Sequence, residues 1–74
     1  MELKENDTMK DVLMSAQTQD KPVYIQVKSG TQFMGTIQQV GRNCISLKLI
    51  GDRSFYDAII RIEEIAVVEI QLRS

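Results

Sequence analysis

The chain has 74 residues, of which 43% are hydrophobic, and nine basic residues against ten acidic ones give a formal net charge of −1. A chain of this length forms one small domain, and its core is marginal unless a crosslink, a metal or self-association supports it. The single cysteine, Cys44, excludes an internal disulfide, and the absence of histidine excludes a Cys/His metal site, so self-association is the support that remains.

A short helix is predicted over residues 8–19, after a polar segment at residues 1–7 that we expect to be disordered. Thr8 can cap the helix, and apolar residues then recur at intervals of three and four, which is typical of one buried helix face: Met9, Val12, Leu13 and Ala16. Pro22 cannot continue a helix and favours extended geometry in the residue before it, so the helix is expected to end before this point.

From residue 23 the hydrophobic period changes to two, which indicates β-strands. Glycine-containing turns are predicted at Ser29-Gly30, at residues 41–43 and at residues 51–54, and a short connection at Glu63-Glu64. They divide the rest of the chain into five strands, at residues 23–28, 31–40, 44–50, 55–62 and 65–72. One helix followed by five short strands predicts a mainly β fold, a strongly bent antiparallel barrel of SH3-like or OB-like type over residues 23–72, in a single domain over 1–74.

Two features of these strands need an explanation beyond alternation. Gly35 stands in the middle of the longest strand, where we expect the missing side chain to let the strand bend sharply and serve both halves of the barrel. The last two strands, "AIIRIEEIAVVEIQL", are apolar on both faces, which is unusual for edge strands. They are either core strands of a thicker monomer or strands that pair with another subunit, and the small size of the chain favours the second explanation.

The sequence resembles the Sm-like superfamily, which includes the Sm, LSm and bacterial Hfq proteins. The segment "IQVKSGTQFMGTIQQVGRNC" matches the register of the family's first motif, and "IRIEEI" at residues 60–65 echoes the second. The positions in register in the first motif are Gly30, Phe33, Gly35, Ile37, Val40 and Cys44. The resemblance implies an Sm-like barrel that assembles into a ring of five to seven copies, in which the fourth strand of one subunit pairs with the fifth strand of the next.

The resemblance also implies binding of short single-stranded RNA around the ring pore, through the loops after the second and fourth strands. Carried over by position, the RNA-binding residues are Arg42, Asn43 and Arg61. The family's aspartate and uracil-reading asparagine are replaced here by Gly41 and Ile45, so the usual uridine site is incomplete.

Several alternatives remain open for these residues. Arg61 can instead form a salt bridge with Glu63, with Glu64 or with an acid of a neighbouring subunit, and two acids beside an RNA site repel phosphate. Tyr24 and Tyr56 are either base-stacking platforms or ordinary packing residues of the sheet surface. The middle of the chain, residues 21–53, has five bases and one acid, a net charge of +4, which is compatible with RNA but is also typical of solvated lysines.

We therefore predict a homo-oligomeric Sm-like ring that binds single-stranded RNA in RNA metabolism or regulation. The alternative is a ring of the same fold that acts as a protein-interaction scaffold without RNA; a monomeric SH3-like adaptor is a third hypothesis. No catalytic residue is predicted, because without histidine there is no Ser-His or Cys-His pair, and no cofactor or metal is expected. A free cysteine and the absence of a secretory or membrane-spanning segment predict a cytoplasmic protein with no membrane partner.

Overall fold

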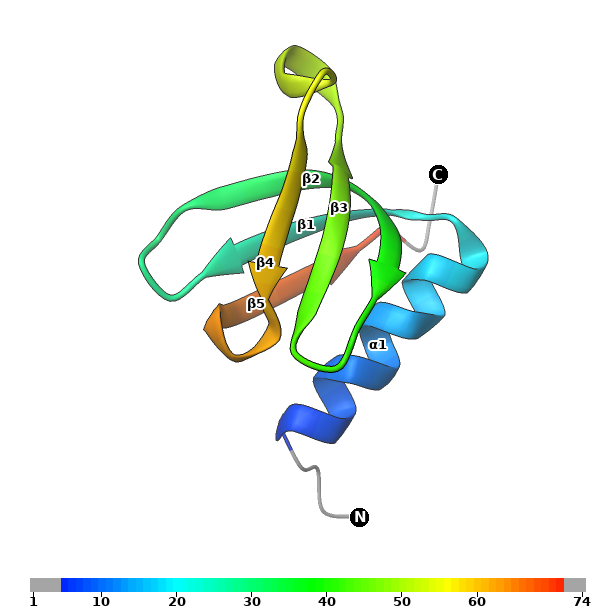
Figure 1. Ribbon diagram of the computed structural model, residues 1–74, viewed down its shortest axis with the longest axis vertical. Coiled ribbons are helices and arrows are strands. Elements are labelled where there is room, and N and C mark those ends of the chain that lie inside the picture. Colours follow the sequence, from blue (N-terminus) through cyan, green and yellow to red (C-terminus); the bar gives the residue numbers. More distant parts are fainter. Residues whose placement is uncertain (1–4, 72–74) are drawn as a thin grey trace.

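The computed structural model describes residues 5–71 and shows one helix and a five-stranded antiparallel sheet, joined by short turns (Figure 1). The elements are α1 (Glu5–Gln19), β1 (Pro22–Val27), β2 (Gln32–Val40), β3 (Cys44–Leu49), the 3-10 turn η1 (Gly51–Arg53), β4 (Asp57–Arg61), the 3-10 turn η2 (Ile62–Glu64) and β5 (Ile65–Ile70). The predicted mainly β fold, with a short N-terminal helix before five antiparallel strands, is confirmed.

The helix and the last two strands differ from their predicted bounds. Strand β5 ends at Ile70, two residues before the predicted end of the fifth strand. Helix α1 begins at Glu5 instead of Thr8, so residues 5–7 belong to the helix and not to a disordered segment; residues 1–4 lie outside the described part of the chain. The predicted fourth strand, 55–62, is shortened to Asp57–Arg61, because residues 51–56 fold into η1 and a following turn, and Ile62 begins η2. No helix within residues 5–71 is long and apolar enough to cross a membrane.

The sheet has the strand order β4-β3-β2-β1-β5, and every neighbouring pair is antiparallel. Strand β2 links its two halves: residues 32–36 pair with β1, and residues 35–40 pair with β3. Figure 1 shows that β3 and β4 cross over β1 and β5, so that the sheet wraps around the core. Strands β4 and β5 are its two edges, and each has only one strand partner among the described residues.

The core lies between the curled sheet and α1. Alternate residues along the strands are buried, in agreement with the hydrophobic period of two, and the helix adds Leu13 and Ala16 from its apolar face. Each fully buried aliphatic side chain contributes about 1.5–3 kcal/mol relative to an exposed one, so this one cluster accounts for most of the favourable term in folding. The buried strand residues are Val23, Ile25, Ile37, Ile45, Leu47, Leu49, Ile60 and Ile65, with Ile62 from η2.

Gly35 is buried at the point where β2 passes from one half of the sheet to the other. It pairs with Leu49 of β3, and a Cβ atom placed on Gly35 would collide with the carbonyl oxygen of Lys48 and lie 3.0 Å from the Cα atom of Leu49. Real Cβ atoms rarely approach other atoms this closely. The glycine therefore allows the β3 backbone to approach β2, which is the local basis of the tight curvature expected from the sequence.

Candidate functional site

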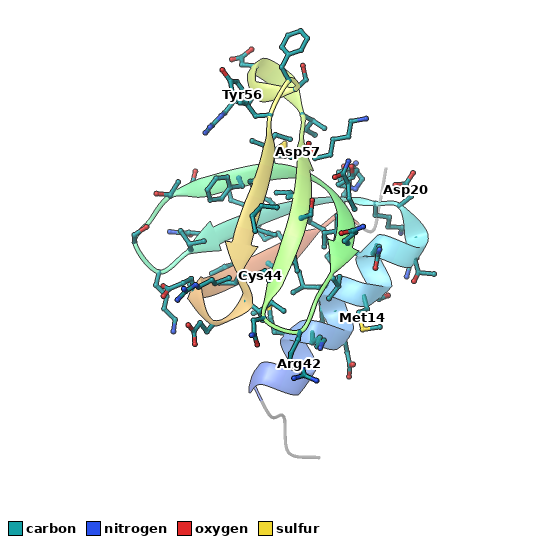
Figure 2. The ribbon with its side chains drawn as sticks, viewed as in Figure 1. Met14, Asp20, Arg42, Cys44, Tyr56 and Asp57 are labelled. Atoms are coloured by element: carbon teal, nitrogen blue, oxygen red, sulfur yellow. The ribbon has the colours of Figure 1, made fainter. Side chains whose placement is uncertain are left out.

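An open hollow lies at the end of the barrel where the β2–β3 turn, η2 and the first half of α1 meet. It is lined by all three residues predicted to bind RNA from the family motifs: Arg42, Asn43 and Arg61, which are separated by up to 19 positions in the sequence. Figure 2 shows Arg42 on the β2–β3 turn, beside the start of α1. The full lining is Lys10, Arg42, Asn43, Cys44, Arg61, Ile62 and Glu63.

Backbone hydrogen bonds bring the two loops of the hollow together. The N–H of Gly41 donates to the carbonyl of Cys44 over 2.8 Å, which closes the β2–β3 turn, and the N–H of Ile62 donates to the carbonyl of Asn43, also over 2.8 Å. Cys44 and Arg61 are direct partners in the antiparallel pair of β3 and β4. The positions of Arg42, Asn43 and Arg61 are thus set by the sheet itself, independently of side-chain contacts.

The rim of the hollow is basic. Lys10, Arg42 and Arg61 supply three positive charges against one negative charge from Glu63, a local net charge of +2. Arg61 Nη1 lies 3.6 Å from Glu63 Oε1, but the two side chains are 72% and 71% exposed. An ion pair that is so exposed is worth little, about 0–1 kcal/mol, and an arginine has further N–H donors to offer. The predicted salt-bridge alternative is therefore present, but it leaves Arg61 accessible to a ligand.

The lining below this rim is partly apolar. Ile62 is buried as part of the core, and Cys44 is a half-buried free cysteine. Asn43 is exposed beside them and carries both a donor and an acceptor on its side-chain amide. An exposed amide and cationic side chains around apolar atoms suit an anionic ligand that has flat, partly apolar groups with polar edges.

Lys10 is the member of the site that sequence reasoning missed. It stands next to Met9 on the predicted helix, and nothing in the local pattern indicates which end of the barrel the helix covers. In the structure α1 packs against β2 and η2, and this packing carries Lys10 to the hollow. The only available signal was that an amphipathic helix before a small barrel must cover part of its core.

The two tyrosines considered as base platforms lie outside this hollow. Tyr24 is half-buried on β1. Tyr56 is 60% exposed at the tip of the β3–β4 hairpin, at the opposite end of the molecule from Arg42 (Figure 2), and the guanidinium carbon of Arg53 lies 5.7 Å from its ring centroid. The structure therefore does not bring the tyrosines together with the predicted RNA-binding residues.

The two edge strands expose apolar side chains, as the sequence pattern predicted. Ile59 on β4 is 70% exposed, and Val67 on β5 is 41% exposed, although both lie within regular strands. Within residues 5–71, each of these edges also presents backbone N–H and C=O groups without a second strand neighbour. Exposed apolar side chains on an open strand edge are typical of surfaces that pair with another strand.

Comparison of the sequence with models of known protein families gives no match, and neither does comparison with curated protein sequences. The fold, in contrast, is similar to solved structures. A crystal structure of Hfq, described as a pleiotropic translational regulator, superposes with a TM-score of 0.69 at 18% identity, over 82% of this chain and 95% of the other. An Hfq protein from Anabaena sp. gives a TM-score of 0.65 at 21% identity, over 82% of this chain and 92% of the other. The arrangement of α1 and the five strands, together with these superpositions, shows that the chain has the Sm-like fold of the Hfq proteins.

Proposed function

We propose that the protein is a ring-forming Sm-like protein that binds short single-stranded RNA at the hollow formed by Lys10, Arg42, Asn43 and Arg61. The observation that carries this proposal is that motif positions distant in sequence line one open, basic hollow with a partly apolar lining. RNA has the matching chemistry, because its phosphates attract cations and its unpaired bases offer flat faces and polar edges.

Ring assembly is the first part of the proposal. The open edges of β4 and β5, with Ile59 and Val67 exposed on them, support pairing of β4 of one copy with β5 of the next. Such pairing is heterologous, so it closes into a ring when the rotation between copies allows it. The resemblance to Sm-like proteins supports a ring of five to seven copies.

Each residue of the hollow then has a definite role. Arg42, Arg61 and Lys10 attract phosphates, and their guanidinium planes or aliphatic chains can also pack against bases. The amide of Asn43 can hydrogen-bond to a base edge. A ring repeats this set around its axis, so that contacts that are weak singly act together on one strand. The role is binding without catalysis, in keeping with the family resemblance, and the cytoplasmic location remains a prediction.

One observation favours the alternative of a ring-shaped protein scaffold without RNA binding. Glu63 lies in the hollow within 3.6 Å of Arg61, and Glu64 is exposed next to it. Repeated around a ring, these carboxylates reduce the attraction for phosphate. RNA affinity is therefore expected to be modest and strongly dependent on salt.

Native mass spectrometry with and without short oligo-U and oligo-A tests assembly and RNA binding in one experiment. The proposal expects a closed oligomer that gains mass with at least one of the two oligomers at low salt. A closed oligomer that binds neither of them would favour the scaffold. A protein that is monomeric at micromolar concentration would refute ring assembly, and therefore both the RNA-binding ring and the scaffold ring.

A further inference from the structure

The tip of the β3–β4 hairpin presents an exposed aromatic pair that the proposed RNA site does not use. Phe55 is 95% exposed and Tyr56 is 60% exposed, and the hairpin projects away from the rest of the molecule, at the end opposite to the start of α1 (Figure 1). Exposure of an almost complete phenylalanine ring contributes nothing to the core of a single chain. It is typical of a contact surface.

The turn that carries these rings is held by several backbone hydrogen bonds. The N–H of Ser54 donates to the carbonyl of Gly51 over 3.2 Å, and the N–H of Tyr56 donates to the carbonyl of Arg53 over 2.9 Å. The carbonyl of Tyr56 in turn accepts from the N–H of Leu49 at the end of β3, over 3.1 Å. Phe55 is therefore presented from a defined turn, which reduces the entropy lost when it binds a partner.

A second feature, a small hollow on the outer face of the sheet, lies at the end of β5. Tyr24 of β1 is the cross-strand neighbour of both Met34 on β2 and Glu69 on β5, and these three residues line the hollow together with Ile70. Met34 is 50% exposed, so part of this lining is apolar and accessible. The hollow has a volume of about 200 Å³, and no residue within 5–71 occupies it.

We infer that Phe55 of one copy packs into the hollow around Tyr24 and Met34 of the next copy, as an anchor of the subunit interface. The inference rests on the proposed ring and names a contact outside its β4–β5 strand pair. Every strand pair in this sheet is antiparallel, and a new pair between β4 and β5 of two copies is expected to follow the same pattern. Antiparallel pairing sets the start of β4 opposite the end of β5, which brings the hairpin tip to the hollow.

The faces of the two strands agree with this arrangement. Asp57 and Ile59 are exposed and share the outer face of β4, and Phe55 stands two residues before Asp57, on the turn that leads into this strand. Tyr24, Met34 and Glu69 occupy the outer face of β1, β2 and β5, opposite to the buried Val23 and Ile25. The outer faces become continuous when β4 of one copy extends the sheet beyond β5 of the next.

The proposed contact has a use that the strand pair alone does not supply. Alternation alone does not fix the register of a strand pair, because a slip by two residues keeps each side chain on the same face of the sheet. An aromatic ring seated in a hollow on the neighbouring subunit has one position, so it selects one register. Phe55 would thereby set how adjacent subunits align.

Photo-crosslinking tests this contact directly. The full chain is prepared with the photoreactive benzoyl-phenylalanine in place of Phe55, mixed with isotope-labelled wild-type chain, assembled and irradiated, and crosslinked peptides are identified by mass spectrometry. We expect crosslinks between copies at Tyr24, Met34 or residues 69–71, with the thioether of Met34 as the favoured target. The same reagent in place of Gln19, which is exposed at the end of α1, should give no crosslink to this hollow.

Substitution provides the second measurement. Phe55→Ser should weaken subunit association by about tenfold, seen as a higher concentration for half-assembly in native mass spectrometry, because truncation of a buried aromatic anchor carries a large cost. Ser54→Ala, on the same turn, is the matched control and should leave assembly unchanged. Because Phe55 is 95% exposed in the single chain, Phe55→Ser should leave the fold intact.

The outcomes separate this inference from the function on which it rests. An assembled wild-type protein without crosslinks from position 55 to the hollow, or with unchanged assembly of Phe55→Ser, would overturn the inference and leave the ring and its RNA site untouched. An assembled protein that binds no RNA but gives the expected crosslinks would support the inference while refuting RNA binding. A wild-type monomer would refute both.

Discussion

Replacement of Gly35 by alanine tests whether close backbone approach explains this glycine. An added Cβ would collide with the Lys48 carbonyl oxygen and lie 2.8 Å from its carbon, so β2 and β3 must move apart at this point. Such overpacking costs about 1–3 kcal/mol. Loss or weakening of one neighbouring ladder hydrogen bond adds about 1 kcal/mol. We therefore expect Gly35→Ala to lower the free energy of unfolding by about 2–4 kcal/mol.

The sign of this effect distinguishes the steric explanation from strand propensity. Glycine within a strand is less favourable than alanine by about 0.5–1 kcal/mol, so without the collision Gly35→Ala should be slightly stabilising. Gly35 has no positive φ angle, which removes backbone strain as a competing cause. The steric clash is therefore the term that decides the outcome.

Urea unfolding followed by circular dichroism measures the effect, at one fixed protein concentration because assembly contributes to stability. Ser29→Ala is a suitable control, since Ser29 is exposed on the β1–β2 turn. Its unfolding midpoint should stay close to that of the wild type. A Gly35→Ala variant with a midpoint equal to or above the wild-type value, at an unchanged m-value, would refute the explanation.

Three further predictions concern the edges and the basic hollow. Ile59→Lys should prevent assembly, as measured by light scattering, while the monomer stays folded, because Ile59 is 70% exposed in the single chain. Val68→Lys, in contrast, places a charge against the core and should unfold the chain. Assembly of the Ile59→Lys variant at wild-type concentrations would contradict the edge pairing. Arg61→Ala should weaken binding of labelled U-rich or A-rich RNA in fluorescence anisotropy, because it removes a positive charge that attracts phosphate. Glu63→Gln should strengthen binding, because it removes a negative charge that repels phosphate. Unchanged RNA affinity in both variants would argue for the scaffold. Lys10→Ala should lower the slope of log Kd against log salt by roughly 0.7 if Lys10 contacts one phosphate, and an unchanged slope would place Lys10 outside the RNA contact.

Strand alternation was enough to predict most of the core from the sequence. The side chains of Ile45, Leu47 and Leu49 alternate with polar ones, and all three are buried in the structure. A period of two determines which face of a strand turns inward wherever the opposite face meets water. The same rule failed at Phe55, because residues 51–56 contain η1 and a turn, where the chain is no longer extended and alternation has no meaning.

The candidate site was predictable only in part. Arg42, Asn43 and Arg61 were found through motif positions, and the pairing of Cys44 with Arg61 explains why two loops distant in sequence meet. Lys10 was not found, because its helix is joined to the barrel by a turn whose geometry decides which surface α1 covers. A hydrophobic period shows that a helix has a buried face, but it carries no information on which distant element receives that face.

The sequence by itself therefore determined the order of the helix and five strands, their buried faces and the apolar character of both sheet edges, since each depends on local periodicity. Only the tertiary structure decided that Lys10 joins the basic hollow, that Gly35 is required by the approach of the Lys48 backbone, and that Phe55 stands exposed at a turn. These three facts depend on the distance between atoms that are far apart along the chain, and such distances are set when the whole sheet closes around its core.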